Sequence, residues 1–163
     1  SRGLGDVYKR QIQPVINKQL TLLTASYGMR IHPFYKTLQS HQGVDYTIPE
    51  GSRVFATADG TVREVAQRNS TSGQTVVIDH GNGYETSYNH LSKINVRKGQ
   101  QVRRGDIIAL SGDTGLSLAP HLHYEVRYNG MRVDPIHYFF MELSPTEYQR
   151  LMRIAQSGMQ SFD

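Results

Sequence analysis

Two histidines lie two residues apart in the run His121-Leu122-His123. Because successive side chains of a β-strand point to opposite faces, both imidazoles would share one face, about 6.5–7 Å apart along the chain. Leu122 and Tyr124 would then point toward a core. Two protonated imidazoles at this separation repel each other, and binding of a cation by one of them relieves the repulsion. The pair therefore predicts a metal site on a strand, with an exposed histidine pair as the alternative.

A second candidate pair is formed by His41 and Asp45, in the run His41-Gln42-Gly43-Val44-Asp45. A helix would bring the two side chains together, but the glycine and the β-branched valine disfavour one. In an extended strand the two residues would lie about 13 Å apart, so they converge only if the chain bends, which Gly43 permits. Taken alone, the run also fits a solvated histidine and a turn-capping aspartate.

Together, the two pairs supply two imidazoles and one carboxylate. Three protein ligands with an open fourth position are typical of catalytic rather than structural zinc. The chain contains no cysteine, so disulfides and thiolate ligands are excluded. Copper would bind more tightly by the Irving–Williams order, but nitrogen and oxygen donors in a tetrahedral set, together with availability, favour zinc. We therefore expect one catalytic zinc ion per chain.

The elements that must position these residues are short and rich in Val, Ile, Thr and Tyr, and glycines separate them. Such runs predict strands of an antiparallel sheet that curls or packs on itself, at 53–56, 60–66, 75–79, 84–90, 107–111 and 123–128. Asn129-Gly130 predicts a hairpin with a type I′ turn between 126–128 and 131–133.

The two ends of the chain differ from this β-rich region. Ser144-Pro145-Thr146-Glu147 provides a cap, a first-turn proline and an acid, and it predicts an amphipathic C-terminal helix. Residues 14–23 are expected to form a short N-terminal helix, and residues 1–11 resemble a cloning or assembly remnant. The predicted fold is a mainly β, compact antiparallel sheet domain at 26–140, with an N-terminal extension at 1–25 and a C-terminal helix at 141–163 packed on it.

The bulk properties restrict the function only loosely. A length of 163 residues favours one domain. The 18 Lys and Arg against 14 Asp and Glu give a net charge of +4, and the basic residues are scattered, so we expect no nucleic-acid partner. No apolar run approaches the roughly 18 residues needed to cross a bilayer, and we expect any targeting segment for export to lie outside this chain.

Over roughly residues 26–138 the sequence resembles a known family, the lysostaphin/LytM-type zinc endopeptidases (metallopeptidase family twenty-three). The matching segments, in chain order, are Tyr27-Gly28-Met29-Arg30-Ile31-His32-Pro33, His41-Gln42-Gly43-Val44-Asp45-Tyr46, Ala58-Asp59-Gly60-Thr61-Val62, Ile78-Asp79-His80-Gly81-Asn82-Gly83, Tyr88-Asn89-His90-Leu91, Gly105-Asp106-Ile107-Ile108-Ala109, Ser111-Gly112-Asp113-Thr114-Gly115 and Pro120-His121-Leu122-His123-Tyr124-Glu125.

The resemblance implies a role for each motif residue. It assigns His41, Asp45 and His123 to zinc. It makes His90 and His121 the active-site histidines that do not bind metal and that transfer protons. The residues expected to face the substrate are Arg30, His32 and Tyr35. The remaining histidines, His80 and His137, are expected to be structural.

The function implied by the resemblance is zinc-dependent hydrolysis of peptide cross-links in bacterial peptidoglycan. The opening motif and the Ser-Pro-Thr-Glu-Tyr tail look more like Gram-negative members, which cut D-alanyl–diaminopimelate bonds, than like glycyl-glycine cutters. We expect peptidoglycan stem peptides as partners, a monomer, and a location in the cell envelope, periplasmic or secreted.

Three other interpretations stay open. A LytM-like module could bind the wall or activate an amidase without hydrolysis. Residues 99–106 resemble a lipoyl or biotinyl carrier barrel, but the turn at 111–115 lacks the lysine that a carrier needs. Nucleic-acid binding is the third, and salt-dependent oligonucleotide binding would reveal it.

Overall fold

The computed structural model describes residues 11–17, 23–25, 28–31, 38–139 and 143–157. The elements are β1 Leu23–Ala25, β2 Gly28–Ile31, β3 Leu38–His41, β4 Val44–Thr47, β5 Arg53–Phe55, β6 Gly60–Ala66, β7 Gln74–Gly81, β8 Tyr84–Ile94, β9 Gln101–Val102, β10 Ile107–Ser111, β11 His121–Tyr128, β12 Met131–Val133, the 3-10 helix Pro135–Tyr138 and the α-helix α2 Pro145–Ser157.

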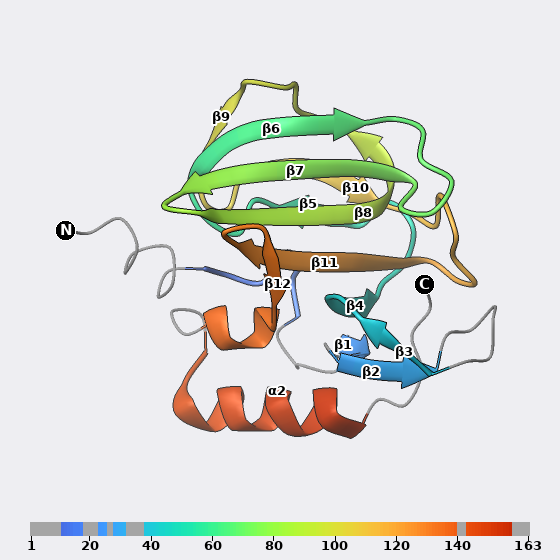
Figure 1. The fold of residues 1–163 in the computed structure, drawn as a ribbon, viewed down its shortest axis with the longest axis vertical. Coiled ribbons are helices and arrows are strands. Elements are labelled where there is room, and N and C mark those ends of the chain that lie inside the picture. Colours follow the sequence, from blue (N-terminus) through green and yellow to red (C-terminus); the bar gives the residue numbers. More distant parts are fainter. Residues whose placement is uncertain (1–10, 18–22, 26–27, 32–37, 140–142, 158–163) are drawn as a thin grey trace.

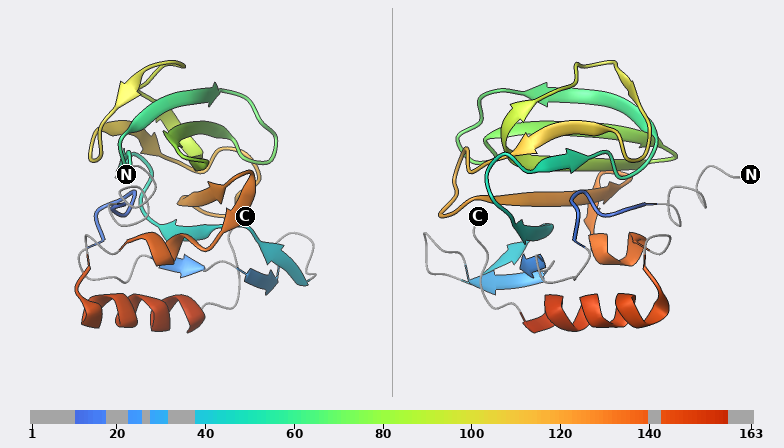
Figure 2. Two further views of the ribbon diagram at one scale, coloured as in Figure 1. Left: turned by 60° about the vertical axis from the view of Figure 1, so that its left-hand side comes forward. Right: turned by 180° about the vertical axis from the view of Figure 1, so that it is seen from behind.

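Ten of the strands form one antiparallel sheet, in which the order β1-β4-β11-β8-β7-β6-β9 is continuous (Figure 1). β10 pairs with both β8 and β5, while β2 and β3 form a separate hairpin. Seen from behind, β5 and β10 form a second layer over β6, β7 and β8 (Figure 2). The sheet therefore folds over on itself, as the sequence predicts.

β8 connects the two layers. Its first part, Tyr84 to Asn89, pairs with β11, and its last part, Leu91 to Ile94, pairs with β10. His90 lies at the change of partner, and its φ is 61°, in the left-handed region that non-glycine residues rarely occupy. The bend at His90 is thus the corner at which the strand passes from one layer to the other.

The core lies between the layers and contains an ordered set of polar groups. Tyr88 and Tyr124 are fully buried, and both hydroxyls contact the Thr57 hydroxyl, at 3.1 and 2.8 Å. Thr86 extends this chain to His80, at 2.9 Å from Tyr88 and 2.7 Å from the imidazole. Buried polar groups are tolerated when they are hydrogen-bonded, and here they fix how the strands sit across the core.

The N-terminal segment differs from the prediction. The helix expected at 14–23 is not formed at residues 14–17, and Leu23 lies in β1. Residues 11–17 instead run along β5, with the Ile12 amide donating to the Thr57 carbonyl and the Phe55 amide donating to the Pro14 carbonyl. The alternation Gln11-Ile12-Gln13-Pro14-Val15 has no helical apolar face, and a proline fits an edge position.

The predicted hairpin and the predicted C-terminal helix are confirmed. Asn129 and Gly130 both have positive φ and join β11 to β12. α2 begins with a reciprocal capping box: the Ser144 amide donates to the Glu147 carboxylate at 3.0 Å, and the Glu147 amide donates to the Ser144 hydroxyl at 3.2 Å. Leu151 of α2 is fully buried in the core. No helix in the described part of the chain is long and apolar enough to cross a membrane.

Candidate metal centre

The register between β4 and β11 places Asp45 directly opposite His123. Their side chains meet, with the Asp45 Oδ1 atom 2.8 Å from the His123 Nδ1 atom, and both side chains are buried. Gly43 allows this close pairing: a Cβ at that position would lie 2.3 Å from the Tyr124 carbonyl oxygen. A glycine is therefore needed at position 43 because the chain approaches the β11 backbone closely there. This constraint is separate from the bend that the sequence suggested.

The side chains of β11 alternate between two faces of the strand, as the sequence predicted. Leu122 and Tyr124 belong to the hydrophobic core, and His121 and His123 lie on the opposite face. That face is also covered, since both histidines are buried. The interpretation of an exposed histidine pair is therefore wrong.

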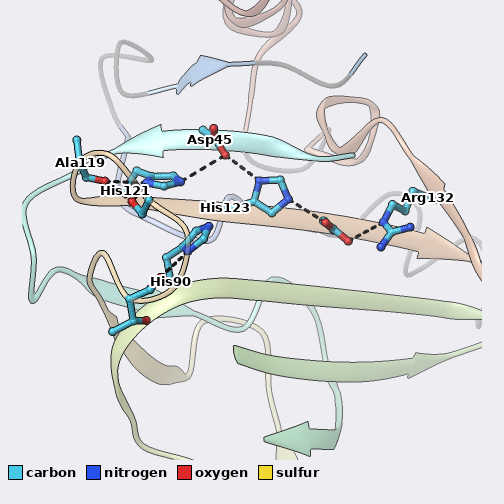
Figure 3. Close-up of polar contacts among 9 residues, drawn as sticks. Asp45, His90, Ala119, His121, His123 and Arg132 are labelled. Atoms are coloured by element: carbon cyan, nitrogen blue, oxygen red, sulfur yellow. Dashed lines mark hydrogen bonds and ion pairs between the residues drawn. The ribbon is translucent and has the colours of Figure 1, made fainter. Parts of the chain in front are cut away.

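Glu125 continues the same face, and sequence reasoning assigned it no role. Its Oε2 atom accepts a hydrogen bond from the His123 Nε2 atom at 2.8 Å, and its Oε1 atom accepts from Arg132 at 3.0 Å (Figure 3). The Oε1 atom also accepts from Arg127 at 3.2 Å. Burial raises the pKa of Glu125, but His123 and Arg132 outweigh it and bring the pKa to about 2. The signal that could have identified Glu125 is its spacing, two residues after His123.

His90 and His121 lie beside this pair, with ring centroids 4.6 Å apart, and the His90 ring is 6.3 Å from that of His123. Each holds a backbone carbonyl through its Nδ1 atom: His90 donates to Thr114 at 2.6 Å, and His121 donates to Ala119 at 2.8 Å. A carbonyl only accepts, so Nδ1 carries the proton and Nε2 is the lone-pair nitrogen of each neutral ring. In Figure 3 the three rings and Asp45 turn toward a common space.

Thr114 holds the corner at His90 in place. Its hydroxyl donates to the Leu91 carbonyl at 2.7 Å and accepts from the Gln74 amide at 3.0 Å, so it ties β8 to the start of β7. The same residue supplies the carbonyl that fixes the His90 ring. Gly73 packs against it so closely that a Cβ would lie 2.3 Å from the Thr114 hydroxyl. A left-handed residue costs about 1–3 kcal/mol and persists only where its surroundings hold it.

The other predicted site residues are described incompletely or not at all. His41 is the last residue of β3, paired with Gly28, and Arg30 lies in β2. The side chains of His41 and Arg30 are not described. His32 and Tyr35 lie outside the described residues. Within the described part, no three potential donors surround one point closely enough to hold a metal ion.

The two histidines expected to be structural contact no member of this cluster among the described interactions. His80 donates to the Asp59 carbonyl at 2.7 Å and accepts from Thr86. Burial lowers its pKa more than the carbonyl and the neighbouring carboxylates raise it. His137 contacts the Tyr148 hydroxyl at 2.8 Å and so joins the 3-10 helix to α2.

The donors Asp45 and His123 fit a zinc ion. A buried carboxylate and a buried imidazole meet at 2.8 Å, and a cation of borderline softness accepts both donor types. The second nitrogen of the same imidazole donates to a carboxylate, as metal-bound histidines do. His41, four residues before Asp45, is the remaining predicted donor.

Comparison with known proteins identifies the family. Residues 39–135 match the model of peptidase family M23, and the chain belongs to this family. It is 49% identical over 106 residues to the peptidoglycan DD-endopeptidase ShyA of Vibrio cholerae, covering 64% of this chain and 24% of that protein. The chain spans about a quarter of the length of the curated relatives it matches.

Solved structures agree with this assignment. The crystal structure of a zinc-containing peptidase from Vibrio cholerae is 38% identical, with a TM-score of 0.69 over 77% of this chain and 39% of that one. The catalytic domain of the antimicrobial peptidase lysostaphin from Staphylococcus simulans is 32% identical, with a TM-score of 0.65 over 77% of this chain and 98% of that one. The predicted family and the mainly β, lysostaphin-type fold are confirmed.

Proposed function

We propose that this chain is a zinc-dependent endopeptidase that hydrolyses peptide cross-links of bacterial peptidoglycan in the cell envelope. The observation that carries the proposal is the meeting of Asp45 and His123 at 2.8 Å, beside two further histidines whose Nδ1 atoms are held by backbone carbonyls. Membership of peptidase family M23 supports it, as does 49% identity to a peptidoglycan DD-endopeptidase.

Asp45 and His123, with His41, would hold the ion in this proposal. Bound zinc supplies Lewis acidity, which acidifies a coordinated water and polarises a carbonyl. The role of Asp45 is to bring negative charge to the buried site. His123 would offer Nδ1 to the ion and keep its proton on Nε2, where Glu125 accepts it.

His90 and His121 would move the protons. Each ring keeps its Nδ1 proton on a carbonyl, so its Nε2 atom is the one that can accept a proton from the attacking water. The same atom can return a proton to the departing amine, and an imidazole suits both steps because its ordinary pKa lies near neutrality. With the two rings 4.6 Å apart, either can take either role. The sequence contains no His-Glu-x-x-His helix that would bring a glutamate base.

Metal binding and turnover can be tested on separate variants. His123→Ala should abolish stoichiometric zinc binding, measured by elemental analysis after dialysis. His90→Ala and His121→Ala should retain zinc and lose roughly 10²-fold or more in kcat. Full zinc occupancy in His123→Ala, or full activity in either of the other two variants, would contradict the assigned roles.

The cross-link is proposed to be the D-alanyl–diaminopimelate bond. The named activity of ShyA, to which the chain is 49% identical over 106 residues, supports this choice. Digestion of Gram-negative and staphylococcal walls, with identification of the fragments by mass, tests it. Release of glycine-terminated fragments alone would overturn the choice, and zinc binding without any hydrolysis would favour a wall-binding or amidase-activating module.

A further inference from the structure

Two arginines face each other across the hairpin that follows the metal centre. Arg127 of β11 pairs directly with Arg132 of β12. Like charges in directly opposite positions destabilise a sheet unless an anion lies between them. Glu125, two residues before Arg127 and hence on its face of the strand, supplies that anion, and its Oε1 atom accepts from both guanidinium groups.

Glu125 does more than balance these charges. The arginine side chains are partly exposed, at 28% and 42%, whereas the Glu125 side chain is only 8% exposed. A carboxylate needed only to offset two surface cations could remain in water, which stabilises its charge. This one is turned inward, and its Oε2 atom contacts the His123 Nε2 atom at 2.8 Å, on the side of the ring opposite to Asp45 (Figure 3).

We propose that Glu125, held by Arg127 and Arg132, is a positioning residue that presents the Nδ1 atom of His123 to a divalent cation shared with Asp45. This inference rests on the proposed function. The physical reason is directional: an ionised carboxylate only accepts hydrogen bonds, so Glu125 keeps a proton on the His123 Nε2 atom. The Nδ1 atom faces Asp45, and a cation bound between the two would take the place of the proton there and meet the Nδ1 lone pair. Both arginines belong to the β11–β12 hairpin. The hairpin therefore fixes the position of the Glu125 carboxylate and, through it, the orientation of the His123 ring.

The test measures zinc affinity without turnover. Metal-free protein is titrated with Zn²⁺ against a chromophoric chelator, for the parent chain, Glu125→Ala, Glu125→Gln and Arg132→Met. Glu125→Ala should weaken zinc binding about 10–100-fold, the usual effect of removing a partner of a metal-bound histidine. Glu125→Gln should lose less, because its amide oxygen still accepts, and Arg132→Met should also weaken binding.

Glu64→Gln is the matched control. Glu64 is exposed on β6, where it lies opposite Val77 of β7, and β7 and β8 separate β6 from β11 in the sheet order. This variant removes one surface carboxylate charge and should bind zinc within about twofold of the parent, as expected for an exposed charge. Thermal unfolding in EDTA checks that every variant folds, and Arg132→Met, which leaves the carboxylate in place, serves if Glu125→Ala does not fold.

A second readout is the tautomer of the ring. Long-range ¹H–¹⁵N spectra of the zinc-loaded parent should show the His123 proton on Nε2, and this signature should be lost or mixed in Glu125→Ala. Parental zinc affinity and an unchanged His123 signal in folded Glu125→Ala would overturn the inference while leaving the proposed function intact. A parent chain that binds no zinc would instead overturn the proposed function.

Discussion

Replacing Gly43 by alanine tests whether the close approach of β4 to β11 sets the metal centre. The added methyl would lie 2.3 Å from the Tyr124 carbonyl oxygen and 2.9 Å from the Glu125 Cγ atom. Both obstacles belong to the partner strand, and the nearer one is backbone, so a side-chain rotation cannot relieve the clash. The strands must separate, and Asp45 lies only two residues away on the strand that moves.

The size of the expected effect follows from how much closer the added methyl would lie to the Tyr124 carbonyl oxygen than an ordinary contact allows. Ordinary contact begins near 3.4 Å, so β4 must retreat by about 1 Å, and overpacking of this kind costs about 1–3 kcal/mol in the free energy of unfolding. A displacement of about 1 Å at a reacting centre reduces rate by about 10²-fold. We therefore expect Gly43→Ala to remain folded, with weakened zinc binding and a loss of kcat near that size.

The assay combines urea unfolding, zinc titration and peptidoglycan digestion, with Gly99→Ala as the control. Gly99 has a φ of 89° and nothing within 4 Å of its Cβ position, so alanine there costs about 1–2 kcal/mol of backbone strain without a clash. Both variants should lose stability, and only Gly43→Ala should lose zinc affinity. Parental zinc affinity and hydrolysis in Gly43→Ala would refute the view that the distance between the strands places Asp45 against His123.

Three further changes have defined outcomes. Thr114→Val should lower kcat with little change in KM, because the hydroxyl that secures the corner at His90 is lost, whereas Thr114→Ser should restore activity. Burial lowers the pKa of His80 in the fold, so the unfolded chain binds the proton more readily, and stability falls as the pH drops below the ordinary histidine value of about 6.5. His80→Asn should flatten that fall in urea titrations at pH 5 to 7. Ser144→Ala should cost about 1 kcal/mol in unfolding free energy through the lost cap, with activity unchanged, and an equal loss in Ser144→Thr would argue against the capping role.

Local signals predicted much of this fold. The Asn-Gly pair fixed the β11–β12 turn because few other residues adopt positive φ at both positions. Ser144 and Glu147 marked the start of α2 because their side chains satisfy amides that the helix itself leaves unpaired. The alternation at His121 and His123 correctly placed both imidazoles on one face, since a period of two holds in any strand.

Features that depend on distant partners could not be predicted in this way. The corner at His90 arises from a change of strand partner, and nothing in its neighbouring residues indicates it. Gly43 was interpreted as a bend, but its closest constraint is the backbone of β11, far away in sequence. The sequence predicted a helix or an extension for residues 11–17. Their extended conformation is set by backbone hydrogen bonds to Thr57 and Phe55, which lie far away in sequence and leave no local signal.

The position of residues 11–17 affects how far this chain can be shortened from its N-terminal side without losing stability. Gln13 accepts from the Tyr46 hydroxyl at 3.2 Å, and Gln11 accepts from the Tyr124 hydroxyl at 3.0 Å. These tyrosines directly follow Asp45 and His123 in the chain, so the two glutamines brace the reverse side of the strands that carry the donors. A version trimmed to the region that matches the family model, which starts at residue 39, would lose both of these hydrogen bonds, each of which contributes about 0.5–1.5 kcal/mol to stability. Shortened forms of this chain should therefore retain residues 11–17.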